Sequence, residues 1–272
     1  MHMPPYATIE KAVGETPLEA LERLRAQLAI PTEVPMAYAG RLDPMASGTL
    51  LVLIGDECKR QEHYHQLDKA YEFEVLFGTR SDTGDVLGLL TWERPLEVTK
   101  ETLDIATTDL TGKLELPYPL FSSKTVGGKP LHTWTLEGRL DEIEIPIART
   151  TLHRLTCTNL RSVVGRDVYE HVNQKIDTIP EVTDERKQLG ADFRRKEVHL
   201  NWDTWLEYHK NTDIQIATFS AICSSGTYMR SLAEEIGRRV GVSSLAYSIH
   251  RSRIGQYQPL PLVGGFWKKR FK

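Results

Sequence analysis

The sequence predicts an α+β fold, because strand and helix patterns are mixed along the chain without regular βαβ alternation. The 272 residues suit one large domain or two small ones, and 40% hydrophobic residues are enough for a real core. No apolar run approaches the roughly 18 residues that a membrane span requires. We therefore expect no contact with a membrane.

Helix signals occur at three places. Residues 16–19 (Thr-Pro-Leu-Glu) form a capping box with proline at the first helical position, and leucines then repeat at helical spacing until Pro31. Residues 100–110 are compatible with a second helix. A third helix is expected to open at residues 228–230 (Tyr-Met-Arg) and to close at Gly241. Helix N-termini favour anions, so Arg230 adds a fixed positive group beside any acid that it meets.

Strand patterns lie between these helices. Residues 71–77 alternate with a period of two, which predicts a strand with one buried face. Buried or partly buried strands are also expected at residues 49–54, 150–164 and 214–222. Polar or turn-rich loops are expected at 78–88, from 117 to 128, and at 224–227.

Residues 165 to about 212 differ in character from the rest. They carry charged runs at 184–187 and 194–197, together with Trp202, Trp205 and Tyr208. The aromatic content is too high for a linker, and the periodicity is too low to predict a core element. We interpret this segment as a partly ordered insertion and favour packing on the surface over contact with a ligand.

One loop stands out as a candidate for chemistry. Asp43 lies between Gly40 and Gly48, with Pro44 directly after it and an apolar strand following. Glycine permits unusual backbone conformations and proline restricts its own and the preceding residue, so the loop is expected to be rigid. Such a loop can present a catalytic carboxylate, but Asp-Pro beside glycine is also ordinary turn chemistry.

The charge distribution is uneven, although the net charge is only −3. Residues 230–272 carry nine Lys or Arg and two Glu, a net +7, so the remainder carries about −10. This asymmetry is consistent with a face that binds a polyanion. The cluster Lys268-Lys269-Arg270 fits RNA contact and a solvated tail equally well.

Cysteine and histidine usage argues against metal and disulfide chemistry. Cys58, Cys157 and Cys223 are widely separated, and no Cys or Glu partner lies at metal spacing near His63 and His65. The first six residues lack the charged and apolar regions of a signal peptide. We therefore expect a cytoplasmic protein without a metal.

A series of collinear motifs resembles the TruB family of tRNA pseudouridine synthases. The loop from Gly40 to Gly48 and its strand are similar to the family's active-site motif. Further matches are 69–71 (K-x-Y), 79–88 (R-T-D-T-x-D-x-x-G), 119–138 (P-x-Y-S-A…G-K-x-x-Y…G), 225–232 (S-K-G-T-Y-I-R-S-L) and 249–255 (L-R-R-T-x-V-G). The matches extend over residues 40–255 and leave out the 165–212 insertion.

The resemblance implies a pseudouridine synthase fold, with a mixed, mostly antiparallel central sheet flanked by helices and loops. It implies a single catalytic domain over residues 1–272. Many relatives continue into a C-terminal PUA domain, for which this sequence has no room. RNA contact would then come from the catalytic domain, the basic tail and the insertion.

The resemblance also implies catalytic roles. Asp43 matches the nucleophile, and Arg230 matches the arginine that keeps this carboxylate ionised and oriented. Tyr71 matches an aromatic residue that stacks on the target base and moves a proton from the sugar. Tyr228 and Ile249 match pocket-lining positions. Isomerising uridine to pseudouridine needs neither redox chemistry nor an external nucleophile, so no cofactor is expected.

RNA recognition follows from the same resemblance. Lys59 matches a phosphate-contacting lysine, and the matched motifs place Arg41, Asp85 and Arg251 in the substrate- and RNA-binding set. The implied substrate is the T-loop uridine (position 55) of tRNA, held as a T-arm stem-loop and flipped into the pocket of a monomeric enzyme.

Three departures from the family pattern are visible. Tyr38 stands where the family has a histidine near the flipped base, so base handling or RNA preference is expected to differ. The N-terminal K-P-x-G-x-T-S pattern is altered between Lys11 and Pro17, and Lys124 lies one residue early.

Two other functions compete with an active synthase. A non-catalytic RNA-binding or tRNA-folding module would use the same fold, but it would not need Asp43, Tyr71 and Arg230 together. A nucleoside hydrolase would need a second carboxylate as acid or base, and the Asp43 motif has no obvious acidic partner.

Overall fold

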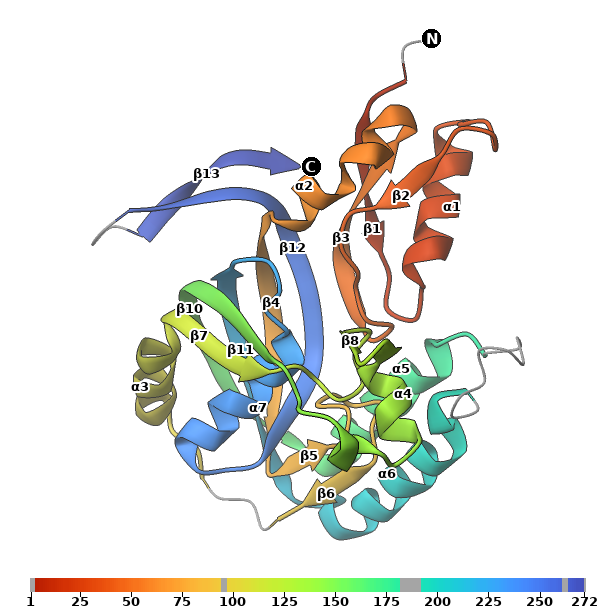
Figure 1. Cartoon of the computed structure of the whole chain (residues 1–272). Coiled ribbons are helices and arrows are strands. Elements are labelled where there is room, and N and C mark those ends of the chain that lie inside the picture. The colour runs from red at the N-terminus through yellow and green to blue at the C-terminus, as the bar shows by residue number, and fades with distance from the viewer. Residues whose placement is uncertain (1–2, 94–96, 182–191, 261–263, 272) are drawn as a thin grey trace.

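The computed structural model describes residues 3–93, 97–181, 192–260 and 264–271. Its main sheet has nine strands, seven of which follow the order β1-β3-β12-β4-β11-β10-β7, while β2 pairs with β3 and β13 pairs with β12. Among the described strands of this sheet, β3 and β12 form the one parallel pair. The predicted α+β class and the mixed, mostly antiparallel sheet are therefore confirmed (Figure 1).

The strands of the main sheet are β1 (Tyr6–Lys11), β2 (Met36–Tyr38), β3 (Ala46–Ile54), β4 (Asp68–Phe77), β7 (Gly112–Pro117), β10 (Ile147–Val164), β11 (Asp213–Cys223), β12 (Ser244–Leu260) and β13 (Gly264–Phe271). Two small ladders lie apart from it, formed by β5 (Thr79–Ser81) with β6 (Leu90–Trp92) and by β8 (Thr125–Val126) with β9 (Lys129–Pro130).

The helices are α1 (Pro17–Gln27), α2 (Gln61–His65), α3 (Lys100–Leu110), α4 (Leu131–Leu136), α5 (Gly165–Thr178), α6 (Arg195–His209) and α7 (Met229–Val240). Short 3₁₀ turns occupy η1 (Gly55–Arg60), η2 (Leu140–Glu142) and η4 (Asp192–Arg194). None of the helices in the described ranges is long and apolar enough to cross a membrane.

Helix α1 confirms the predicted capping box. The Thr16 hydroxyl accepts from the Glu19 amide, and the Glu19 carboxylate accepts from the Thr16 amide. Leu21 and Leu24 are buried, but Leu18 and Leu28 are exposed, and the helix ends at Gln27. Only the central leucines of the repeat therefore form its buried stripe.

The long strand β12 joins the two parts of the sheet (Figure 1). It pairs antiparallel with β4, and its residues 249–251 pair in parallel with residues 46–48 of β3. Gly48 makes this contact with φ +116°, and a Cβ there would lie 2.3 Å from the Arg251 carbonyl oxygen. Glycine is required because the two backbones approach so closely. This contact fixes where the Asp43 loop leaves the sheet.

Figure 1 shows α3 and α7 packed on one side of the sheet and the α5–α6 pair around its lower end. Helix α7 begins beyond the turn at 224–227 and ends at Gly241, whose φ of +77° forms the C-cap, as predicted. The predicted helix at 100–110 matches α3.

The structure corrects the interpretation of the 165–212 segment. Trp202 and Trp205 are fully buried within the main hydrophobic cluster, and Val168, Val172 and Ile176 of α5 join them there. The indole N–H groups donate to Val86 O and Thr79 Oγ1. The apolar spacing of Val198, Trp202 and Trp205 is helical and was the signal that sequence analysis missed. The charged run at 184–187 lies outside the described residues.

Candidate active site

The loop that carries Asp43 is held from several sides. Arg251 of β12, with only 1% of its surface exposed, donates from Nε to Thr49 O (2.9 Å) and from Nη1 to Arg41 O (3.1 Å). The Gly14 amide donates to Pro44 O at 2.9 Å. These bonds satisfy carbonyl groups on both sides of Asp43 and hold the loop in one conformation.

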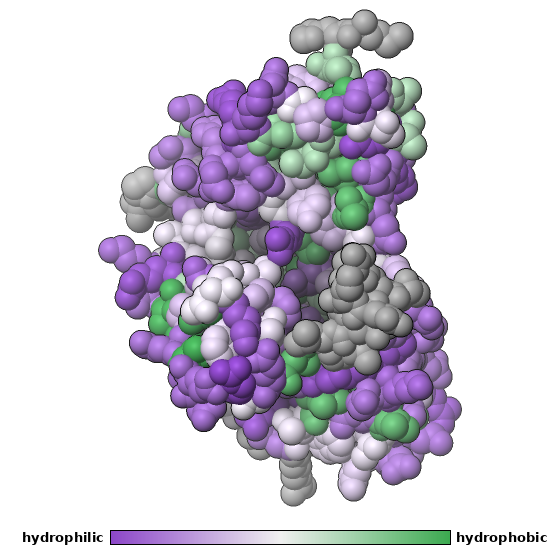
Figure 2. All heavy atoms as spheres, turned by 45° about the vertical axis from the view of Figure 1, so that its right-hand side comes forward, coloured by the Kyte–Doolittle hydropathy of each residue, from purple (hydrophilic) through white to green (hydrophobic). Residues whose placement is uncertain are grey.

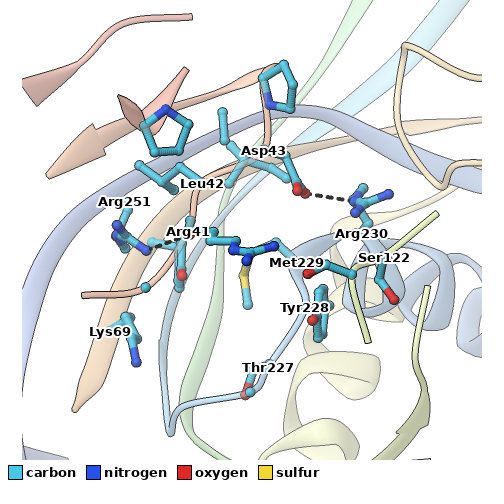
Figure 3. Close-up of a pocket in the computed structure, with 18 of the residues that line it drawn as sticks. Arg41, Leu42, Asp43, Lys69, Ser122, Thr227, Tyr228, Met229, Arg230 and Arg251 are labelled. Atoms are coloured by element: carbon cyan, nitrogen blue, oxygen red, sulfur yellow. Dashed lines mark hydrogen bonds and ion pairs between the residues drawn. The ribbon is translucent and has the colours of Figure 1, made fainter. Parts of the chain in front are cut away.

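Asp43 and Arg230 are in direct contact in the wall of one cavity, as the resemblance of the motifs implied. Arg230 Nε lies 2.8 Å from Asp43 Oδ2 and 3.6 Å from Asp85 Oδ2 (Figure 3). The guanidinium also donates to two backbone carbonyls, Thr83 O at 2.8 Å and Phe121 O at 3.1 Å. One buried cation therefore joins two carboxylates and two loops.

The environment of this cluster perturbs its titration. Burial opposes the charge of Arg230, but Asp43 and Asp85 outweigh it and hold the pKa of the guanidinium above its ordinary value. Burial raises the pKa of Asp85, while the charge of Arg230 acts in the opposite direction. Thr83 Oγ1 (2.7 Å) and the Leu87 amide (2.9 Å) both donate to Asp85 Oδ1. Asp85 is therefore a fixed, buried carboxyl group beside Arg230.

A cavity of about 610 Å³ opens over Asp43. Six other residues predicted for the site line it together with Asp43 and Arg230: Tyr38, Arg41, Tyr71, Tyr228, Ile249 and Arg251. Figure 2 shows a hollow where the upper part of the molecule, with the N-terminal elements, meets the lower part. In Figure 3 Arg230 lies directly beside Asp43, while the labelled side chains of Tyr228 and Lys69 lie on the side of the cavity away from the Asp43 loop. Its size is typical of a small-ligand site.

Tyr71 lies on β4, directly opposite Arg251 of β12 in the antiparallel register. Its side chain is buried, and this burial raises the pKa of its phenol. The charge of Arg251 acts in the opposite direction but does not overcome burial. The hydroxyl is therefore neutral near pH 7, and the ring offers a flat apolar surface beside Asp43.

Lys69 is a lining residue that was quoted within a motif but not predicted as part of the site. Its Nζ donates to His65 O (3.1 Å), Leu67 O (2.5 Å) and Ser225 Oγ (3.0 Å). Burial lowers the pKa of Lys69 to about 8. The K-x-Y motif carried this signal, because Lys69 and Tyr71 alternate onto one face of β4.

Three of the predicted RNA-binding residues lie elsewhere or are used internally. Lys59 is exposed on η1, outside the lining of the cavity, and pairs with Asp56 at 2.7 Å. Arg251 lines the cavity, but its Nε and Nη1 donate to Thr49 O and Arg41 O, on either side of Asp43. Asp85 contacts Arg230. Among the described residues, no group of three or more His, Cys, Asp or Glu side chains is arranged to hold a metal ion.

A second cavity of about 720 Å³ adjoins the first. Both are lined by Tyr38, Arg41, Lys69 and Tyr228, so the two cavities form one continuous groove. The second part runs past Tyr38 to α1 and is lined there by Arg25 and Leu21. Arg25 is paired there with Glu22 at 3.0 Å and donates to Pro31 O and Val34 O, so Arg41 is the exposed basic side chain of the shared part of the groove.

The architecture is a pseudouridine synthase fold, as two comparisons with known proteins show. The fold resembles a chain in a crystal structure of a Cbf5-Nop10-Gar1 complex, with a TM-score of 0.50 and 14% identity, covering 92% of this chain and 48% of that chain. Residues 32–178, more than half of the sequence, match the N-terminal domain model of the TruB family pseudouridylate synthases. The chain therefore belongs to the TruB family.

Curated relatives agree with this assignment. The chain is 25% identical to tRNA pseudouridine synthase B of Caldicellulosiruptor saccharolyticus and 28% identical to that of Azoarcus sp. strain BH72. Each alignment covers 92% of this chain, but 67% and 64% of the respective relative. The chain thus spans about two thirds of the length of these relatives.

Proposed function

We propose that this chain isomerises uridine to pseudouridine in tRNA, with the T-loop uridine at position 55 as its target. The observation that carries the proposal is the 2.8 Å ion pair between Asp43 and Arg230 at the floor of a nucleoside-sized cavity. The relatives named tRNA pseudouridine synthase B support tRNA as the substrate class.

Asp43 acts as the nucleophile of the reaction. The isomerisation breaks the N1–C1′ bond of uridine and forms a C5–C1′ bond, while C5 loses a proton and N1 gains one. An oriented carboxylate beside C1′ can carry the glycosyl group between these two bonds. Arg230 holds Asp43 in place through a charge-assisted contact, and Asp85 holds Arg230 in turn.

The cavity walls hold the base while it is detached. Tyr71 presents its ring beside Asp43, and Ile249 and Tyr228 close the same space. Apolar and aromatic walls retain a flat base and keep water away from the reacting carbon. Burial keeps the Tyr71 hydroxyl neutral, so we assign stacking on the base as the role of its ring; accepting a proton from the sugar would require the phenolate.

A uridine in a structured loop has to leave its stack to reach Asp43. The groove beyond Tyr38 has room for the neighbouring nucleotides, and the exposed Arg41 supplies positive charge for their phosphates. This arrangement supports recognition of an exposed RNA loop rather than a regular duplex.

The proposal is tested with a T-arm RNA transcript, followed by chemical mapping of pseudouridine. Wild-type protein is expected to modify the single T-loop uridine. Asp43→Asn is expected to bind the RNA but to give no product. RNA binding without product from the wild type would instead indicate a non-catalytic binding module, and release of free uracil would indicate a hydrolase.

A further inference from the structure

A left-handed turn precedes helix α6. Asp192, Phe193 and Arg194 have φ values of +50°, +45° and +61° in succession. Such a conformation is unfavourable for residues with a Cβ, and it persists only where surrounding contacts enforce it. Backbone strain of this kind is concentrated at functional positions. The side chains of this turn make the contacts that hold it in place.

Arg195, the first residue of α6, holds the turn in place by contacts with Asp192 and with the end of α5. Its Nε lies 2.5 Å from Asp192 Oδ2, and its Nη1 and Nη2 donate to Ile176 O (2.6 Å) and Ile179 O (2.7 Å). The guanidinium also lies over the Phe193 ring, 4.6 Å from its centroid. These contacts tie the turn to the end of α5, so the direction of Arg194 is fixed.

Arg194 reaches two separate loops. Its Nη1 and Nη2 donate to the two carboxylate oxygens of Asp82, at 2.6 and 3.1 Å. Its guanidinium lies over the Phe121 ring, 4.7 Å from the centroid. A bidentate carboxylate contact and a stacked ring use the flat guanidinium group in a way that lysine cannot reproduce.

The same two loops hold Arg230. Thr83, next to Asp82, and Phe121 supply the two backbone carbonyls that accept from the Arg230 guanidinium. Arg194 therefore contacts the outer side of both segments whose inner side holds the partner of Asp43. A shift of either segment would move these carbonyl groups and tilt Arg230.

We propose that Arg194 is a positioning residue, which clamps residues 82–83 to residue 121 and so fixes Arg230 and the reactive orientation of Asp43. The inference rests on the proposed function, because its effect is expressed in the chemical step. It assigns a role to the 165–212 segment, which the family motifs leave out. A contact to an RNA phosphate is the competing role, since a fifth of the Arg194 side chain is exposed.

The test compares Arg194→Ala and Arg194→Lys with a matched control, Arg161→Ala. Arg161 pairs with Glu74 at 2.7 Å, and the side-chain exposures of this pair, 35% and 20%, mirror the 20% and 35% of Arg194 and Asp82. Arg161 and Glu74 are not among the residues lining the cavity. Single-turnover rates are measured with saturating enzyme on T-arm RNA, together with the Kd for the RNA.

Arg194→Ala is expected to lower the single-turnover rate about tenfold to a hundredfold, the scale of a misplaced catalytic group, with the Kd within about twofold of wild type. Arg194→Lys should be intermediate, and Arg161→Ala should keep the wild-type rate. An unchanged rate in Arg194→Ala overturns the proposal. So does a higher Kd with an unchanged saturated rate, which would indicate phosphate contact, or an equal loss in Arg161→Ala.

An NMR measurement on the protein without RNA tests the role of Arg194 independently of the proposed activity. The Nε–H NMR signal of Arg230 reports its contact with Asp43, and it should shift or broaden in Arg194→Ala but not in Arg161→Ala. If the wild type makes no pseudouridine, the proposed function fails, yet an altered Arg230 signal still supports the clamp. An unaltered signal contradicts it whatever the activity.

Discussion

The Arg230 guanidinium lies 2.8 Å from the Asp43 carboxylate, although Asp43 belongs to an N-terminal loop and Arg230 to the first turn of α7. The parallel contact of β3 with β12 and the start of α7 beyond β11 bring them together. Because Asp85 Oδ2 lies 3.6 Å from the same Arg230 Nε, the cation is shared between two carboxylates.

Loss of the Arg230 charge should leave Asp85 buried without a counterion. Removing one partner of a buried pair costs about 3–5 kcal/mol, so Arg230→Gln is expected to lower the free energy of unfolding by about that amount. Adding Asp85→Asn should restore part of the loss, because the uncompensated charge disappears. Urea denaturation of both single variants and the double variant checks this coupling. Simple additivity would contradict it.

Gly48 should not tolerate any side chain, because the backbone of Arg251 leaves no space for a Cβ atom there. A Cβ at Gly48 would lie 2.3 Å from Arg251 O and 2.6 Å from Arg251 N, so Gly48→Ala should break the β3–β12 contact and disorder the Asp43 loop. Gly55→Ala is the matched control, since Gly55 also has positive φ but has no atom within 4 Å of a built Cβ among the described residues. It should cost only about 1–2 kcal/mol of backbone strain. Thermal unfolding distinguishes the two; equal losses would show that packing against Arg251 is unimportant.

The indole of Trp202 should contribute a hydrogen bond as well as packing. Trp202→Phe keeps an aromatic side chain but leaves Val86 O without its 3.0 Å donor. The expected loss of unfolding free energy is about 1–3 kcal/mol, the cost of an unsatisfied buried group together with some lost packing. Denaturant titration measures it, and a change within error would mean that α6 is not an integral part of the core.

Lys175 should make the free energy of unfolding depend on pH in the alkaline range. Burial lowers its pKa to about 8, below the ordinary 10.5, so between these values the unfolded chain binds a proton that the folded chain has released. Stability contributed by this site therefore rises with pH across that window. Lys175→Met lacks the effect, so its stability relative to wild type should fall by about 1–3 kcal/mol from pH 7.5 to 10. A constant difference would contradict the lowered pKa.

Local patterns were sufficient for much of the fold. The capping box at Thr16, the period-two run at 71–77 and the Gly241 cap each depend on neighbouring residues, and each was confirmed. The order of strands depends on contacts far apart in sequence, so no local pattern contains it. Trp202 and Trp205 were misinterpreted because surrounding charges masked their helical spacing.

For the site, residue types were easier to predict than partners. The motifs indicated Asp43, Tyr71 and Arg230, and the structure places all three around one cavity. They did not indicate that Arg251 would be buried while holding the Asp43 loop, or that backbone carbonyls of Thr83 and Phe121 would hold Arg230. Every residue type carries the same backbone carbonyl group, so the sequence does not reveal which carbonyl accepts a hydrogen bond.

The most direct test of the central claim is tritium release from T-arm RNA labelled at C5 of uridine, measured for the wild type and for Asp43→Asn. Formation of the C5–C1′ bond expels the C5 hydrogen, so the wild type should release one tritium per target uridine. Asp43→Asn should release none while binding the RNA with wild-type affinity. Release at the wild-type rate from Asp43→Asn would contradict the assignment of Asp43 as the nucleophile, and absence of release from the wild type would contradict the proposed activity.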